Sequence, residues 1–135
     1  MKKIDTACIV DDDSIFTYGV KKLMEISNFC ERILVFHNGL DAIQHIKVLI
    51  NNKETLPEVL LLDLNMPIMD GWQFLDEIIK IEPANSITIF IVSSSIDSHD
   101  HEKALEYKRI SKFIIKPILK SDLEKILTEF NKPTL

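Results

Sequence analysis

The chain of 135 residues has little cysteine, no long apolar run and no excess of positive charge. Its two cysteines, Cys8 and Cys30, have no metal-ligand spacing and form no disulfide framework, so we expect free thiols. No apolar run approaches the roughly 18–20 residues that span a membrane, and the apolar part of "MKKIDTACIV" is too short for a secretion signal. The formal net charge of −5 argues against a nucleic-acid-binding surface. These features favour a cytoplasmic protein that contacts neither membrane nor nucleic acid.

Short apolar runs alternate with longer amphipathic segments along the whole chain. The runs are nearly continuous in apolar residues, which is typical of strands buried on both faces of a sheet. They lie at 6–10, 33–36, 59–62, 87–92 and 112–115. A helical periodicity follows each run, least clearly at 98–108, and "SDLE" predicts that Ser121 and Glu124 form a capping box for the last helix. The order predicts one α/β domain over residues 1–135, with helices on both faces of a parallel sheet.

Polar and charged residues follow four of the predicted strands. They are Asp11, Asp12 and Asp13 after the first strand, Asp63 and Asn65 after the third, Ser93, Ser94 and Ser95 after the fourth, and Lys116 after the fifth. In an open sheet of this kind, ligands bind outside the carboxyl ends of the strands. We therefore expect these side chains to meet at one edge of the sheet.

Acids from two strand ends form an oxygen-rich site that suits a hard cation. Mg²⁺ prefers octahedral oxygen coordination and takes one or two carboxylates together with several waters. A cation offsets the repulsion between the acids and leaves one of them free to attack phosphorus as a nucleophile. A lysine and a hydroxyl at neighbouring strand ends suit the charge on a transferred phosphoryl group. The residue types therefore indicate metal-assisted phosphoryl transfer to a carboxylate.

The motifs "IVDDD", "LLLDLNMPIMDGWQFL", "IFIVSSS" and "FIIKP" resemble the receiver domain of bacterial two-component response regulators. The resemblance covers residues of about 4–130 and implies a flavodoxin-like, doubly wound (βα)5 fold with strand order 2-1-3-4-5. It implies a signalling switch, not an enzyme, that accepts a phosphoryl group from a sensor histidine kinase or histidine phosphotransfer protein. We expect a stand-alone receiver without an output domain. It would control an unknown downstream protein as a monomer or a phosphorylation-dependent dimer.

The resemblance also implies a role for each residue of the site. Asp63 matches the phosphoacceptor, and Lys116 matches the lysine that pairs with the phosphoryl group. Ser93 matches the hydroxyl that turns toward the phosphoryl oxygens, and Phe113 matches the aromatic switch that rotates inward with it. The Mg²⁺ ligands that it implies are Asp11, Asp12, Asp63 and the main-chain carbonyl of Asn65.

The sequence departs from the family pattern in two segments. "LINNKETLPE" (49–58) lengthens the part between Asp12 and Asp63, and we interpret it as a loop away from the site. "ALEYKRISKF" (104–113) lacks the glycine that receivers usually carry before the fifth strand and is one residue longer. We therefore expect an altered loop shape beside Phe113.

Other readings of the same residues lead to different functions. Asp11 and Asp13 have the spacing of the acids in a haloacid-dehalogenase-type phosphohydrolase, although that class does not explain "DLNMPIMDG". A degenerate receiver that binds partners without phosphorylation is a third class.

Asp13 also suits the entrance of a helix, where Asp is favoured. The "HDH" at 99–101 resembles a metal pair, but it has no third ligand nearby and we expect a solvated face.

Overall fold

The computed structural model describes residues 2–133, and Met1, Thr134 and Leu135 of the predicted 1–135 domain lie outside the described residues. The elements are β1 (Ile4–Val10), α1 (Ser14–Ile26), β2 (Cys30–Phe36), α2 (Gly39–Asn51), β3 (Val59–Leu62), α3 (Gly71–Ile78), the 3-10 helix η1 (Glu82–Ser86), β4 (Thr88–Ser93), α4 (Ser98–Leu105), β5 (Ile110–Ile115) and α5 (Lys120–Phe130). All predicted strands and helices are present, and η1 was not predicted. None of the helices between residues 2 and 133 is long and apolar enough to cross a membrane.

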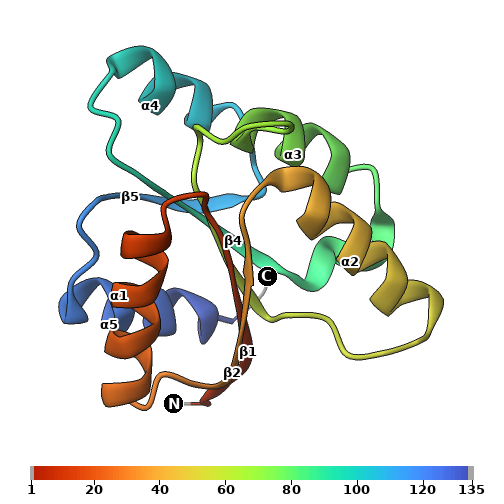
Figure 1. The fold of residues 1–135 in the computed structure, drawn as a ribbon, viewed down its shortest axis with the longest axis horizontal. Coiled ribbons are helices and arrows are strands. Elements are labelled where there is room, and N and C mark those ends of the chain that lie inside the picture. Colours follow the sequence, from red (N-terminus) through yellow and green to blue (C-terminus); the bar gives the residue numbers. More distant parts are fainter. Residues whose placement is uncertain (1, 134–135) are drawn as a thin grey trace.

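The strands form one parallel sheet in the order β2-β1-β3-β4-β5, which confirms the expected topology. Figure 1 shows α1 and α5 together on one face of the sheet and α2 and α3 on the other. The chain leaves β2 at one edge and returns across β1 to form β3. Ligands of doubly wound sheets bind at such a reversal of strand order. The carboxyl ends of β1 and β3 therefore meet where a site is expected.

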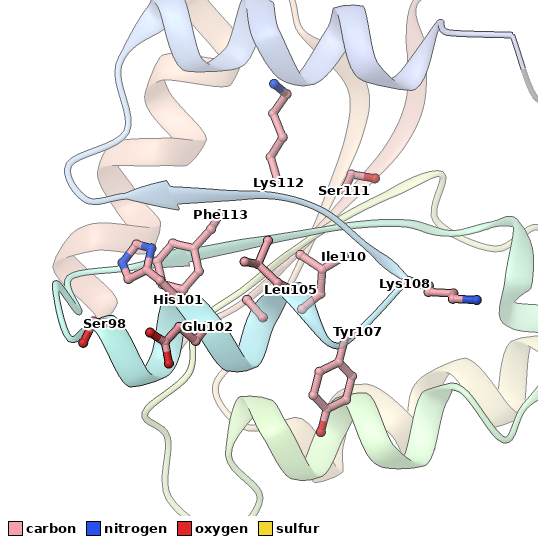
Figure 2. A pocket seen from close by; sticks show the side chains of 11 residues that line it. Ser98, His101, Glu102, Leu105, Tyr107, Lys108, Ile110, Ser111, Lys112 and Phe113 are labelled. Atoms are coloured by element: carbon pink, nitrogen blue, oxygen red, sulfur yellow. The ribbon is translucent and has the colours of Figure 1, made fainter.

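The pairing of β4 with β5 is irregular at the start of β5, within the segment that the sequence indicates is one residue longer than usual. The pairing steps from Ile89 with Ile110 to Phe90 with Lys112, so Ser111 is left over as a β-bulge. Figure 2 shows Ser111 at the start of β5, near Ile110. The preceding loop is held by Arg109, whose guanidinium donates to the carbonyls of Ala84 at 2.9 Å and Ile87 at 3.2 Å. No residue from 106 to 109 has a positive φ, so this loop needs no glycine.

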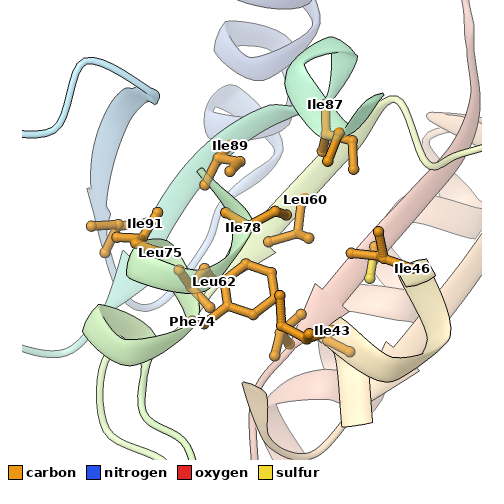
Figure 3. Packing of buried hydrophobic residues seen from close by; sticks show 14 of the residues in the cluster. Ile43, Ile46, Leu60, Leu62, Phe74, Leu75, Ile78, Ile87, Ile89 and Ile91 are labelled. Carbon is orange, nitrogen blue, oxygen red and sulfur yellow. The ribbon is translucent and has the colours of Figure 1, made fainter. Parts of the chain in front are cut away.

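Two apolar clusters attach the helices to the sheet. One lies under α2 and α3 and contains the fully buried Leu60, Leu62, Phe74 and Ile78, as Figure 3 shows. The other lies under α1 and α5 and is built from residues of alternate strand positions and the inner helix faces. Its largest buried members include Ile4, Ile9, Met24, Leu61, Phe90 and Ile126. Both faces of the sheet are covered, which explains why the strand sequences are nearly continuous in apolar residues.

Short polar side chains begin most of the helices. Asp13 caps α1 by accepting the N–H groups of Ile15 at 3.0 Å and Phe16 at 3.1 Å, which confirms the expected helix entrance. Asn38, Asp70 and Asp97 cap α2, α3 and α4 in the same way.

The predicted start of the last helix is wrong. α5 begins at Lys120 with Leu119 as its N-cap, and the Leu119 N–H donates to Asp122 Oδ2 at 2.8 Å. Ser121 is therefore already inside the helix, because the chain turns into it two residues earlier than "SDLE" suggests.

The expected loop at 49–58 is also shorter than predicted. α2 continues through Asn51, because Ile50 still packs against the cluster under α2 and α3. Only the part from Asn52 onward is irregular, with Lys53 at a φ of 56°. This segment leads into β3 through the Glu58 N–H, which donates to the Thr6 carbonyl at 2.9 Å.

Candidate functional site

Asp11, Asp12 and Asp63 meet at the carboxyl ends of β1 and β3. Each offers a carboxylate oxygen, and these oxygens lie within 4.8 Å of one another. Asp11 is 1% exposed and Asp63 is 7% exposed, whereas Asp12 is open to solvent. The sheet itself sets the spacing, since the Asp63 N–H donates to the Val10 carbonyl at 2.9 Å. The cluster predicted from the strand ends is therefore present.

Lys116 brings a positive charge to these acids from the end of β5. Its Nζ lies 2.8 Å from Asp11 Oδ2 and 3.8 Å from Asp63 Oδ2. The Lys116 N–H donates to the Ser93 carbonyl at 2.9 Å, which continues the β4–β5 pairing past the strand ends. The ammonium also lies 4.2 Å from the centre of the Phe16 ring, an additional favourable contact for a cation. Asp11 is thus the more closely paired acid, and Asp63 the less neutralised one.

Burial and like charge both disfavour ionisation of the inner acids. Burial, followed by the charge of Asp11, raises the pKa of Asp63 to about 6, although Lys116 opposes the shift. Burial also raises the pKa of Asp11, against the opposing effect of its contact with Lys116. Without a further cation, the two buried carboxylates compete for one ammonium group.

The carboxylate oxygens suit a hard cation. Asp11 Oδ1 accepts the Asp13 N–H at 2.9 Å, and Asp63 Oδ1 accepts the Leu64 N–H at 2.9 Å. These bonds fix one oxygen of each carboxylate. Asp11 Oδ2 is buried and, despite its proximity to Lys116, accepts no well-oriented hydrogen bond from residues 2–133. A buried carboxylate oxygen that pairs with Lys116 and lies beside two further carboxylates belongs to the kind of donor set that Mg²⁺ takes.

The β3–α3 segment is folded tightly against Asp63. The Gly71 N–H donates to the Leu64 carbonyl at 2.9 Å, and a Cβ at Gly71 would clash with the main-chain oxygen of Asp63. The Gly39 N–H donates to the Met69 carbonyl at 3.0 Å. Ile68 projects from this segment, 75% exposed and with a φ of 69°. No spacing in the sequence indicates this close approach of Gly71 to the aspartate.

The other predicted site residues lie at neighbouring strand ends or within β5. Ser93 is fully buried at the end of β4, and its Oγ accepts the Ser95 N–H at 3.2 Å. Asn65 is exposed, two residues after Asp63. Phe113 is half-buried in β5, and its ring is stacked on His101. The structure thus gathers Asp11, Asp12, Asp63 and Lys116 directly, while Phe113 contacts α4.

Two of the alternative interpretations do not fit the structure. Asp13 accepts two backbone N–H groups at the start of α1, which leaves it no role as the second acid of a phosphohydrolase. The expectation of a solvated "HDH" face is wrong for His101, because its ring stacks on Phe113 and Nε2 lies 3.1 Å from the Ser95 carbonyl. A tertiary contact of this kind leaves no periodic signal in the sequence. His99 is exposed, as expected.

Comparison with known proteins identifies the family. The family model described as the response regulator receiver domain matches residues 7–128. The chain belongs to the response regulator receiver family. It is a receiver domain of the two-component type, and the match gives no support to the phosphohydrolase alternative.

The chain is similar to receivers that belong to proteins of different kinds. The chain is 31% identical over 123 residues to a protein-glutamate methylesterase/protein-glutamine glutaminase of Methanococcoides burtonii, covering 90% of this chain and 32% of that protein. A two-component response regulator from Cytophaga hutchinsonii has a TM-score of 0.88 at 24% identity, covering 96% of this chain and 98% of the other. The receiver domain of a sensor histidine kinase, PA1611 from Pseudomonas aeruginosa PAO1, has magnesium coordinated in its active-site cleft. Its TM-score is 0.77 at 18% identity, covering 93% of this chain and 96% of that one.

Proposed function

We propose that Asp63 of this receiver accepts a phosphoryl group from a phosphohistidine of a sensor histidine kinase or phosphotransfer protein. The observation that supports this most directly is the unequal sharing of Lys116, whose Nζ is 2.8 Å from Asp11 and 3.8 Å from Asp63. Of the two buried acids, Asp63 therefore has the weaker contact with Lys116, and its Oδ2 is the freer oxygen. In the transfer, this oxygen forms a bond to phosphorus while the P–N bond breaks, and the electron pair returns to the donor imidazole.

We assign Asp11, Asp12, Asp63 and the main-chain carbonyl of Asn65 as the ligands of Mg²⁺. A bound Mg²⁺ supplies charge that keeps the acids ionised and balances the phosphoryl oxygens. Asp12 is the exposed member through which a hydrated cation can enter, and Asp11 holds the inner position. The raised pKa of Asp63 supports the assignment, because a cation removes the repulsion that contributes to it.

Lys116 and Ser93 are proposed to recognise the phosphoryl group once it is attached. Lys116 exchanges part of its contact with Asp11 for the phosphoryl oxygens, and Ser93 turns its hydroxyl toward them. Phe113 then changes position, and the altered surface binds a downstream protein. Phosphorylation acts by shifting two pre-existing states, so its effect is limited by the difference in affinity between them. The protein is a switch without an external substrate, and its free thiols at Cys8 and Cys30 suit the cytoplasm.

The decisive experiment is to incubate the protein with Mg²⁺ and acetyl phosphate and to measure its intact mass. We expect one added phosphoryl group in the wild type, none without Mg²⁺, and none in Asp63→Asn. Asp13→Asn is the matched control, since asparagine caps a helix as well as aspartate does and should leave labelling unchanged. Full labelling of Asp63→Asn at the same stoichiometry would overturn the assignment of the nucleophile.

A further inference from the structure

The ring of His101 lies at the junction of α4, β5 and the β4–α4 loop. Figure 2 shows it beside Phe113 at one end of a surface hollow between α4 and β5. The two ring centres are 3.8 Å apart and the planes are inclined by 24°, so the rings are stacked. His101 Nε2 lies 3.1 Å from the carbonyl oxygen of Ser95. One side chain therefore contacts both the aromatic residue of β5 and the backbone of the loop.

The same loop residue, Ser95, is connected to the buried hydroxyl at the end of β4. The Ser95 N–H donates to Ser93 Oγ at 3.2 Å, and the Ser95 hydroxyl donates to Asp100 Oδ2 at 2.7 Å. Contacts thus run without a gap from Ser93 through Ser95 to His101 and on to Phe113. When the Ser93 side chain rotates about χ1 toward the phosphoryl oxygens, Oγ moves away from the Ser95 N–H and this bond is lost. The Ser95 carbonyl, which contacts His101, belongs to the residue that loses this bond to β4, while the Ser95 hydroxyl remains bonded to Asp100 and to the Asp97 N–H.

We propose that His101 is a positioning residue that couples the Ser93 hydroxyl to the Phe113 ring. In the conformation described here, the imidazole holds Phe113 against α4 and is itself held by the Ser95 carbonyl. Loss of the Ser93–Ser95 bond lets the Ser95 carbonyl shift, which weakens this hold and frees Phe113 to move. The inference rests on the proposed function, in which a phosphoryl group on Asp63 attracts Ser93.

The contacts of His101 stabilise one of the two states of the switch. Their loss should therefore shift the resting equilibrium toward the other state even without phosphorylation. An aromatic pair of this geometry corresponds to a change of about two- to tenfold in such an equilibrium. Among residues 2–133, the imidazole makes no hydrogen bond or ion pair with Asp11, Asp63 or Lys116, so phosphorylation itself should continue.

The test uses the full chain in two variants and one matched control. His101→Ala removes both contacts, and His101→Phe keeps an aromatic ring but removes the contact to Ser95. His99→Ala is the control, because His99 is an exposed histidine of the same helix, two residues away. Phosphoryl content is measured by intact mass. The position of the Phe113 ring is followed by its NMR resonances, between the limits set by the wild type before and after treatment with acetyl phosphate and Mg²⁺.

We expect unphosphorylated His101→Ala to move about two- to tenfold toward the phosphorylated limit. His101→Phe should stay near the resting limit and respond to phosphorylation less than the wild type does. His99→Ala should match the wild type throughout. A labelled protein in which both His101 variants behave like His99→Ala would overturn this inference alone, and His101→Phe decides the matter if His101→Ala does not fold. Failure of Asp63 to take up phosphoryl would overturn the proposed function, and this inference with it.

Discussion

At Asp63, the reaction requires the ionised carboxylate, whereas burial in the fold favours the protonated acid. Its carboxylate must be ionised to attack phosphorus, yet burial and the nearby Asp11 raise its pKa to about 6. An acid whose pKa is higher in the folded protein than in the unfolded chain binds more protons when folded. The stability contributed by this group is therefore present at low pH and is lost as the pH rises through about 6.

This predicts that Asp63→Asn stabilises the metal-free protein at pH 7.5. The neutral amide removes the ionisation cost, while its Oδ1 can still accept the Leu64 N–H. We expect a gain of about 1–2 kcal/mol in the free energy of unfolding, after allowance for solvent screening. The gain should shrink below pH 5, where Asp63 is protonated, and should be measured by urea unfolding across this range. A gain that grew as the pH fell would contradict the assigned sign of the pKa shift.

At the scale of one strand, the β-bulge in β5 accommodates a single unpaired residue, Ser111. Ser111 has no partner in the β4 register, whereas Phe113 and Ile115 pair with Ile91 and Ser93. The extra residue is thus absorbed before the strand reaches Lys116. The register that brings Lys116 to the acids is unaffected by it.

We therefore expect deletion of Ser111 to change the free energy of unfolding by less than about 1 kcal/mol. The variant should keep the phosphorylation-dependent shift of the amide resonances in β5 and α4. Deletion of Ile115 is the matched control, because it moves Lys116 by one position and turns its side chain to the other face of the sheet. If both deletions abolished the response equally, the bulge would not be the isolated insertion that the pairing indicates.

At the element level, the apolar periodicity of the sequence predicted the strands and helices that form the core. All five strands and helices follow from their apolar patterns, and Asp13 follows from the preference of aspartate for helix starts. The start of α5 was misplaced because the Asp122 carboxylate accepts the Leu119 N–H and so caps the helix two residues earlier. The end of α2 was misplaced because Ile50 packs against the cluster under α2 and α3. η1 was missed since Glu82–Ser86 is too short to show a period.

The site was predictable where strand ends alone determine it. Asp11, Asp12, Asp63 and Lys116 meet because parallel strands bring their carboxyl ends to one edge. The contacts of Phe16 with Lys116 and of His101 with Phe113 were not predictable. They depend on side-chain directions across elements, which no spacing along the chain encodes.

For the whole molecule, the Mg²⁺ site that we propose at three clustered acids predicts that metal binding and folding are coupled. At ten times its dissociation constant, Mg²⁺ should add about 1.4 kcal/mol of stability, or about 5 °C in Tm. We expect Asp12→Ala to fold normally and to lose most of this gain, because Asp12 is exposed. Thermal unfolding with MgCl2 and with NaCl at equal ionic strength measures the effect. An equal gain in NaCl would attribute it to general screening.

The closed base of the β3–α3 segment separates substitutions in the loop from changes at Asp63. The Gly71 N–H is bonded to the Leu64 carbonyl directly beside Asp63, and the Met69 carbonyl accepts the Gly39 N–H, so residues 65–70 form a short loop that is closed at its base. Within this loop, Met66 packs against the cluster under α2 and α3, whereas Ile68 is 75% exposed. Ile68 can therefore be replaced without disturbing Asp63, most easily by asparagine or glycine, which suit its φ of 69°. Sequence changes at Ile68 can therefore alter which partner proteins contact the entrance of the site, while the chemistry at Asp63 stays the same.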